Sequence, residues 1–162
     1  MSARGLSREM RNRALSGVLM AGFLLAIWQS AVAMSELGPR GVLTDFDAFY
    51  LTGQLVLEGR AAEAHDFARM AAIQQALTGQ ENFMPWTYPP QFDLMTAALP
   101  LLPRGLAYAL VTGATLALFL WLIARLAGPA LLAVLLCGAM PIYVNATVGQ
   151  NAFLTGSLMA GF

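Results

Sequence analysis

An uncharged run at residues 14–35, ALSGVLMAGFLLAIWQSAVAMS, limits the possible folds of this chain more than any other feature. The hydrocarbon core of a bilayer is about 30 Å thick and needs roughly 20 apolar residues of helix. The run therefore predicts one membrane-spanning helix. A cleaved signal peptide also places basic residues before an apolar stretch, but its apolar core is typically about 7–15 residues long. The length of this run favours the anchored span.

The charged residues are segregated along the chain. Residues 1–13 carry four arginines and one glutamate, whereas residues 36–90 carry seven acidic residues and three arginines. By the positive-inside rule, the basic start lies in the cytosol. Residues 36–90 are then an extracytoplasmic loop.

The composition also indicates a membrane protein. The chain has 162 residues, of which 58% are hydrophobic and 11% charged, whereas a soluble domain has about 25% charged residues. The formal net charge is zero, so we expect no basic surface for nucleic acid. The one cysteine, Cys137, excludes an internal disulfide. These features predict an all-α, multi-span helical membrane protein with a single membrane domain.

Within the outer loop, residues 61–77 have the period of an amphipathic helix. Apolar residues recur there at steps of three and four, at Phe67, Met70, Ile73 and Leu77. Such a helix lies flat on the membrane or covers a cavity, and an ordinary packed helix would show the same pattern. Residues 78–80, TGQ, are expected to end it.

The stretch at residues 85–94, PWTYPPQFDL, is expected where the outer loop re-enters the bilayer. Proline suits the first helical turn, because its missing N–H has no partner to lose there. Asp93 would follow in that turn, where the helix dipole favours a carboxylate. Trp86 and Tyr88 suit the headgroup level. We expect a short helix over residues 91–102, broken by prolines near Arg104.

Residues 91–162 are expected to form further membrane helices, and the chain stops inside an apolar stretch, which suggests a fragment. Residues 105–124 are a second run long enough to span, and residues 130–144 are apolar up to a polar island at 145–151, NATVGQN. Counting every helix as a crossing places Arg104 inside, Arg125 outside and the island inside. If residues 130–144 re-enter without crossing, the island faces outside.

The strongest candidates for chemistry are Asp45 and Asp47, in the segment DFDAFY about ten residues beyond the first span. Desolvation near a bilayer surface raises the pKa of a carboxylate and makes it a better base. The alternative is a solvated turn, with Asp45 as the N-cap of a helix that begins near Asp47.

The remaining polar residues carry weaker signals. His65 is the only histidine, so we expect a surface helix position and no zinc site. Asp93 is expected at a helix start and not in catalysis. The outer cations that a phosphate could meet are Arg40, Arg60 and Arg69.

The order of these pieces resembles glycosyltransferase family 87. It runs through a basic start, a first span, DFDAFYLTGQLVLEGR, an amphipathic helix, YPP, a short helix ending in PLLP, a long span and GQN. The resemblance extends over about residues 14–162, as the N-terminal portion of a longer enzyme. The family pattern of Asp, apolar, any residue, apolar and aromatic is matched at residues 45–49.

The resemblance implies a C-type glycosyltransferase in the bacterial cytoplasmic membrane, with its active site facing away from the cytosol. Its donor would be a polyprenyl-phosphate sugar, carrying mannose or another hexose, and its acceptor a hydroxyl of a glycan or lipid. It implies Asp45 as the general base and calls for no metal or other cofactor. The candidate substrate-binding residues are Asp47, Arg60, Tyr88 and Gln150.

Two other functions stay open on the residues alone. A non-enzymatic membrane protein, such as a small transporter or an assembly subunit, would bind no lipid-linked sugar and would tolerate changes at Asp45. Against a transporter, the spans contain no embedded charge pair. An inactive truncated remnant would be poorly expressed and rapidly degraded.

Overall fold

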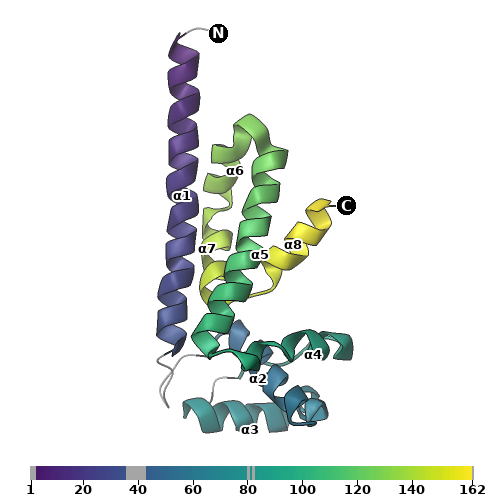
Figure 1. Cartoon of the computed structure of the whole chain (residues 1–162). Coiled ribbons are helices and arrows are strands. Elements are labelled where there is room, and N and C mark those ends of the chain that lie inside the picture. The colour runs from purple at the N-terminus through teal and green to yellow at the C-terminus, as the bar shows by residue number, and fades with distance from the viewer. Residues whose placement is uncertain (1–2, 36–42, 80, 82, 162) are drawn as a thin grey trace. The chain divides into compact units, whose positions relative to one another are not determined.

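A computed structural model describes residues 3–35, 43–79, 81 and 83–161 of the chain. Within these ranges every regular element is a helix and none is a strand (Figure 1). The predicted all-α class is confirmed. The chain divides into two compact units, Ser30–Leu110 on the one hand and Met1–Gln29 with Val111–Phe162 on the other. Ser30–Leu110 is called the outer unit, and the other two segments together are called the membrane unit.

Helix α1, Ala3–Ser35, belongs to the membrane unit up to Gln29, and its 33 residues contain the first predicted span. Residues Glu9–Ala33 are long and apolar enough to cross a bilayer. Large apolar side chains on this helix are exposed, among them Val18, Leu25 and Trp28. Such a surface is unfavourable in water and favourable against lipid, so α1 suits a membrane span.

The second long helix is α5, Arg104–Ala127, with 24 residues. The apolar stretch that is long enough to span a bilayer runs from Arg104 to Cys137 and so extends beyond α5. However, Gly128 has a left-handed φ of 50°, which a residue with a side chain rarely adopts. The chain therefore turns at Gly128. Only the length of α5 should be compared with the thickness of a bilayer, and its 24 residues extend over about 36 Å.

Shorter helices follow this turn. They are η3 (Gly128–Ala130), α6 (Leu131–Cys137), α7 (Ala139–Val148) and α8 (Ala152–Gly161). Helix α8 packs against α5, because the rings of Phe119 and Phe153 lie 5.5 Å apart. Gly156 of α8 also faces Phe119, since a Cβ at that position would lie 3.0 Å from its ring.

The predicted polar island at residues 145–151 is in part the last turn of α7. Asn145 donates a side-chain hydrogen bond to the carbonyl of Pro141, and Thr147 donates one to the carbonyl of Val144. The Asn145 amide nitrogen and the Thr147 hydroxyl thus have partners within their own helix, whereas Oδ1 of Asn145 is buried without a hydrogen-bond partner. The helix ends at Gly149, which has a left-handed φ of 70°.

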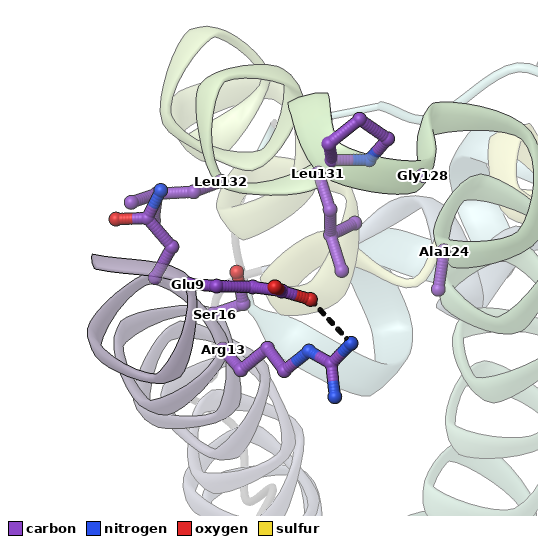
Figure 2. A pocket seen from close by; sticks show the side chains of 9 residues that line it. Glu9, Arg13, Ser16, Ala124, Gly128, Leu131 and Leu132 are labelled. Carbon is purple, nitrogen blue, oxygen red and sulfur yellow. Dashed lines mark hydrogen bonds and ion pairs between the residues drawn. The ribbon is translucent and has the colours of Figure 1, made fainter. Parts of the chain in front are cut away.

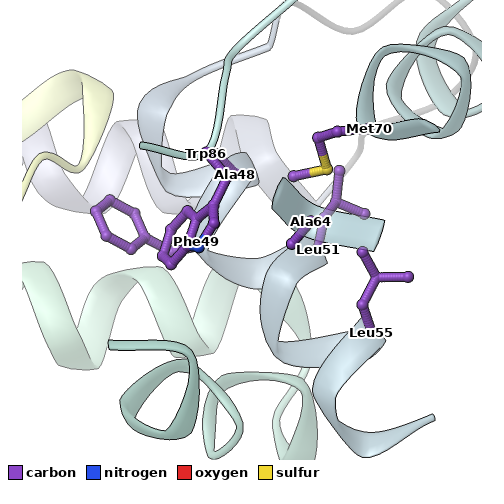
Figure 3. Packing of buried hydrophobic residues seen from close by; sticks show 7 residues of the cluster. All are labelled: Ala48, Phe49, Leu51, Leu55, Ala64, Met70 and Trp86. Atoms are coloured by element: carbon purple, nitrogen blue, oxygen red, sulfur yellow. The ribbon is translucent and has the colours of Figure 1, made fainter. Parts of the chain in front are cut away.

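The outer unit holds α2 (Asp45–Leu57), η1 (Ala61–His65), α3 (Phe67–Thr78), α4 (Pro90–Thr96) and η2 (Leu99–Leu101). Its core joins α2, η1, α3 and the segment before α4 (Figure 3). The core residues are Ala48, Phe49, Leu51, Leu55, Ala64, Met70 and Trp86. Burial of these side chains holds the outer unit together at roughly 25 cal/mol per Å² of apolar surface.

The predicted amphipathic helix over residues 61–77 is two elements and not one. Asp66 interrupts it, because its carboxylate accepts hydrogen bonds from the backbone N–H groups of Ala68 and Arg69 and caps α3. Of the predicted apolar stripe, Met70 is buried in the outer unit, whereas Phe67 and Leu77 are exposed. The end of α3 at Gly79, with a φ of 67°, confirms the predicted stop.

The buried face of α3 contains Met70, Gln74 and Thr78. Gln74 is buried because its amide makes two hydrogen bonds of 2.8 Å to the backbone N–H and carbonyl of Met84. The Gln74 amide therefore binds the backbone of Met84 as a neighbouring strand would. Hydrophobic periodicity could not identify Gln74 as a buried residue.

The helix expected over residues 91–102 is shorter than predicted. Helix α4 has seven residues and begins with Pro90 in its first turn, which confirms the role given to the prolines. Leu99–Leu101 form only a turn of 3₁₀ helix. Neither element is long enough to cross a bilayer, which takes about 20 residues.

Candidate functional site

The N-terminal turn of α2 brings the two candidate carboxylates into different environments. Thr44 is the N-cap, Asp45 is the first helical residue and Asp47 is the third. The alternative in which Asp45 caps the helix is therefore wrong. On a helix, side chains two positions apart diverge by about 200°, so Asp45 and Asp47 face different neighbours.

Asp47 is buried and has several partners. Its Oδ2 accepts hydrogen bonds from the backbone N–H of Thr44 at 2.6 Å and from the Thr44 hydroxyl at 2.9 Å. Its Oδ1 forms an ion pair with Nη2 of Arg104. The side chains of Asp47 and Arg104 are only 4% and 16% exposed. A carboxylate held in this way stabilises the start of α2, and both of its oxygens already have partners.

This ion pair also corrects the predicted membrane crossings. Arg104 was expected on the cytosolic side, opposite the outer loop. Its contact with Asp47 at the start of α2 instead puts the beginning of α5 on the same side as the loop. The physical reason is the shortness of α4, which returns the chain without a crossing.

The Asp47–Arg104 pair lines a small cavity of about 190 Å³. Polar side chains from α2 share its lining, namely Tyr50 and Gln54. The Tyr50 hydroxyl donates a hydrogen bond of 2.9 Å to the carbonyl of Leu102. The cavity thus combines a guanidinium, an amide and a phenol at the start of α5.

Asp45 is half-buried and lies one helical turn before Phe49 on the same side of α2, and the ring centroid of Phe49 is 5.1 Å from that of Tyr88. Burial raises the pKa of the Tyr88 phenol above its usual value, and the negative charge of Asp45 raises that pKa further. The structure therefore brings together Asp45 and Tyr88, which are both candidate site residues.

Tyr88 belongs to a group of aromatic rings. It stacks on Phe92, with ring centroids 4.8 Å apart and an interplanar angle of 20°. The rings of Trp86 and Phe49 lie 4.8 and 5.1 Å from Tyr88. These contacts join the start of α4 to α2 and fix the position of Tyr88 beside Asp45.

A second buried carboxylate, Asp93, links three segments of the outer unit. Its Oδ1 accepts a hydrogen bond of 2.8 Å from the indole N–H of Trp86. Its Oδ2 lies 2.9 Å from Nε2 of His65. Asp93 lies in the first turn of α4, as expected. It is also buried, at 5% exposed, and contacts Trp86 and His65, which was not expected.

Sequence reasoning missed this association of His65 with Asp93. His65 was expected on a helix surface, and its side chain is 33% exposed at the end of η1. A usable signal was present in Trp86, because a buried indole N–H usually requires a partner. Asp93 was the nearest carboxylate in the sequence after Trp86.

Arg60, a candidate for substrate binding, is far from Asp45 along α2. Asp45 is the first of the 13 residues of α2, which is about 20 Å long, and Arg60 lies three residues beyond the other end. The guanidinium of Arg60 pairs with Glu63 at 2.8 Å and Glu58 at 2.6 Å. The hydrogen bond to Glu63 and then that to Glu58 raise the pKa of Arg60, and Arg60 in turn lowers the pKa of Glu63.

The other candidates lie elsewhere. Gln150 belongs to the membrane unit, directly after the Gly149 that ends α7, and its side chain is exposed. Arg40 falls outside the described residues. In the part of the chain that the structure describes, no three His, Cys, Asp or Glu side chains are grouped to hold a metal ion.

Comparison with known proteins finds one similarity, which covers the C-terminal part of the chain. The family model described as glycosyltransferase family 87 matches residues 86–162. The match includes Tyr88, Arg104 and Gln150, and it begins after Asp45 and Asp47. No curated protein and no solved structure matches the chain. Over residues 86–162, the chain is similar to glycosyltransferase family 87.

Proposed function

We propose that the protein transfers a hexosyl group, such as mannose, from a polyprenyl-phosphate donor to an acceptor hydroxyl. The acceptor is a glycan or a lipid, and transfer takes place at the extracytoplasmic face of the bacterial cytoplasmic membrane. The observation that carries this proposal is the half-buried Asp45 on the side of α2 whose Phe49 packs against Tyr88, in a chain that matches a glycosyltransferase family model over residues 86–162.

Asp45 is the general base in this proposal. As the acceptor oxygen attacks the anomeric carbon of the sugar, its proton passes to the Asp45 carboxylate. The bond between the anomeric carbon and the phosphate oxygen breaks, and the polyprenyl phosphate leaves with the electron pair. Asp47 is a weaker candidate for the base, because Thr44 and Arg104 already engage both of its oxygens.

Arg104 is the cation that we assign to the leaving phosphate, in place of Arg60. Guanidinium groups bind phosphate oxygens through charge-assisted hydrogen bonds, which would stabilise the charge that develops on the departing group. Arg104 lines a cavity near the N-terminal turn of α2, whereas Arg60 is held by two glutamates beyond the other end of that helix.

A topology with three crossings accompanies this mechanism. The N-terminus is cytosolic, α1 crosses outward and α5 crosses back, so that Arg125 reaches the cytosol with the arginines of residues 1–13, in keeping with the positive-inside rule. Residues 131–148, which hold α6 and α7, then cross outward again. Gln150 is thereby on the same side of the membrane as Asp45.

The test is sugar transfer by the protein expressed from its complete coding frame in membrane vesicles. The substrate is a radiolabelled polyprenyl-phosphate mannose with endogenous acceptors. We expect Asp45→Asn to lower kcat by about 100-fold or more, the usual contribution of a general base. The matched control is Asp66→Asn, because asparagine also caps a helix and Asp66 caps α3.

The outcomes separate the proposals. Full transfer by the Asp45→Asn variant would refute the base assignment and leave the glycosyltransferase assignment standing. Failure of the wild-type protein to bind or use any polyprenyl-phosphate hexose would refute the reaction itself. That second result would favour a non-enzymatic membrane protein.

A further inference from the structure

A cavity in the membrane unit has no part in the proposed transfer. It has a volume of about 690 Å³ and lies between the N-terminal half of α1 and the turn that joins α5 to α6 (Figure 2). Glu9 and Arg13 reach into it from α1, and Leu131 points into the same space. Its volume falls in the range of small-molecule sites, roughly 300–1,000 Å³.

The lining of this cavity has two chemical characters. One wall is polar and comes from α1, with Glu9, Asn12 and Arg13. The opposite wall is apolar and includes Leu131 and Leu132 of α6. A ligand that satisfies both walls has a polar or charged head and an apolar tail, as a membrane lipid does.

The position of the cavity is consistent with a lipid. The first candidate span begins at Glu9, and α5 ends at Ala127, directly before the turn that closes the cavity. Both long apolar helices therefore end at this level. The ends of such helices lie among the lipid headgroups.

The charges near the cavity favour an anionic headgroup. Arg11, Arg13 and Arg125 are exposed at the ends of these two helices, and Glu9 is the acidic residue of the lining. Glu9 holds Arg13 through an ion pair of 2.6 Å between side chains that are 50% and 79% exposed. Ion pairs this exposed are weak, so a phosphate can replace the Glu9 carboxylate on Arg13.

We propose that this cavity binds an anionic phospholipid of the cytosolic leaflet. The lipid phosphate pairs with Arg13, and the adjoining part of an acyl chain lies against Leu131 and Leu132. The negative charge selects this lipid over a zwitterionic one, since the arginines near the cavity outnumber Glu9. This site is independent of the proposed transfer reaction.

The experiment measures lipid binding by the complete chain in detergent micelles, by native mass spectrometry, with phosphatidylglycerol and phosphatidylcholine as the two probes. We expect wild-type protein to retain phosphatidylglycerol in preference. Arg13→Gln should lower its affinity by about fivefold, the contribution typical of one arginine at an anionic membrane surface. Glu9→Gln should raise the affinity, because the competing carboxylate is removed.

The matched control is Arg11→Gln. It removes the same charge two positions away on the same helix, from a residue that does not line the cavity. We expect a clearly smaller loss than for Arg13→Gln. Equal losses of affinity in the two variants would show only a diffuse effect of charge and would overturn the site. Equal retention of the two lipids by the wild-type protein would also overturn it, and so would weaker phosphatidylglycerol binding by Glu9→Gln.

Discussion

The guanidinium of Arg104, the first residue of α5, pairs with the carboxylate of Asp47 in the first turn of α2. Both side chains are largely buried, at 16% and 4% exposed. The pair ties the beginning of a long apolar helix to the outer unit and places the two on one side of the membrane. Its energetic value depends on both partners being present, because a single buried charge without its partner is costly.

The first prediction concerns this pair. Arg104→Gln should destabilise the outer unit by about 3 kcal/mol, since removal of one partner of a buried pair typically costs about 3–5 kcal/mol. The low end of this range applies because Thr44 still donates two hydrogen bonds to Asp47. The measurement is thermal unfolding in detergent, followed by circular dichroism. Arg104→Lys should restore little, because an ammonium cannot reproduce the geometry of a guanidinium.

A double-mutant cycle separates pairing from general damage. Asp47→Asn keeps an oxygen that can accept from Thr44 and loses only the charge. We expect the Asp47→Asn and Arg104→Gln changes together to cost less than the sum of the two single changes, by about 1 kcal/mol or more. Strict additivity would mean that the two side chains do not stabilise one another.

The second prediction tests the closeness of Asp45 and Tyr88. Because burial and then the Asp45 charge raise the pKa of Tyr88, its phenol should ionise later than a free tyrosine, whose pKa is about 10. Asp45→Asn should lower this pKa and leave the part due to burial. The difference in tyrosinate absorbance between each protein and its Tyr88→Phe partner isolates this one titration.

The sign of the linked effect on stability follows from the same shift. A folded pKa above the unfolded one stabilises the fold fully below the unfolded value, about 10, and this contribution is lost as pH rises through the folded pKa of Tyr88. Asp47→Asn serves as the control and should leave the Tyr88 titration in place. An unchanged titration in Asp45→Asn would contradict the proximity of Asp45.

The third prediction concerns the packing of α2 on α4. A Cβ at Gly53 would lie 2.3 Å from the carbonyl oxygen of Thr96, so Gly53→Ala must push the two helices apart. We expect a loss of about 3 kcal/mol, at the upper end of typical overpacking. The control is Gly113→Ala in α5, where nothing lies within 4 Å of the new Cβ and alanine favours the helix. Equal stability of both variants would refute the close approach.

Local patterns predicted several elements of this fold. The uncharged runs predicted the helices now seen as α1 and α5, and the prolines before Gln91 predicted the start of α4. Gly79 predicted the end of α3. Each of these signals depends on a few consecutive residues, whose backbone preferences act within a single helix.

Long-range polar pairing could not be predicted in the same way. Arg104 followed a proline-bounded segment and was interpreted as the flank of a crossing, although its partner is Asp47 in α2. His65 and Asp93 also come together only through the packing of η1 near α4. In each case the charge had a plausible local role, at a helix end or a membrane boundary, and only the tertiary fold supplied the true partner.

The last prediction concerns membrane sidedness, and it follows from the Asp47–Arg104 contact. Since α5 begins on the side of the outer unit, its 24 residues should carry Arg125 to the other side. The 18 residues from Leu131 to Val148 should then bring Gln150 back. We expect cysteines at positions 66 and 150 to react with a membrane-impermeant maleimide in intact spheroplasts, and a cysteine at position 125 to react only after permeabilisation.

The background for this labelling is Cys137→Ala, which removes the one native cysteine. Position 66 reports the outer unit, because Asp66 is exposed at the start of α3. Labelling of positions 66 and 125 from the same side would exclude a crossing by α5. Labelling of position 150 with position 125 instead would mean that α6 and α7 turn back within the membrane, and Gln150 could not then take part in a site with Asp45.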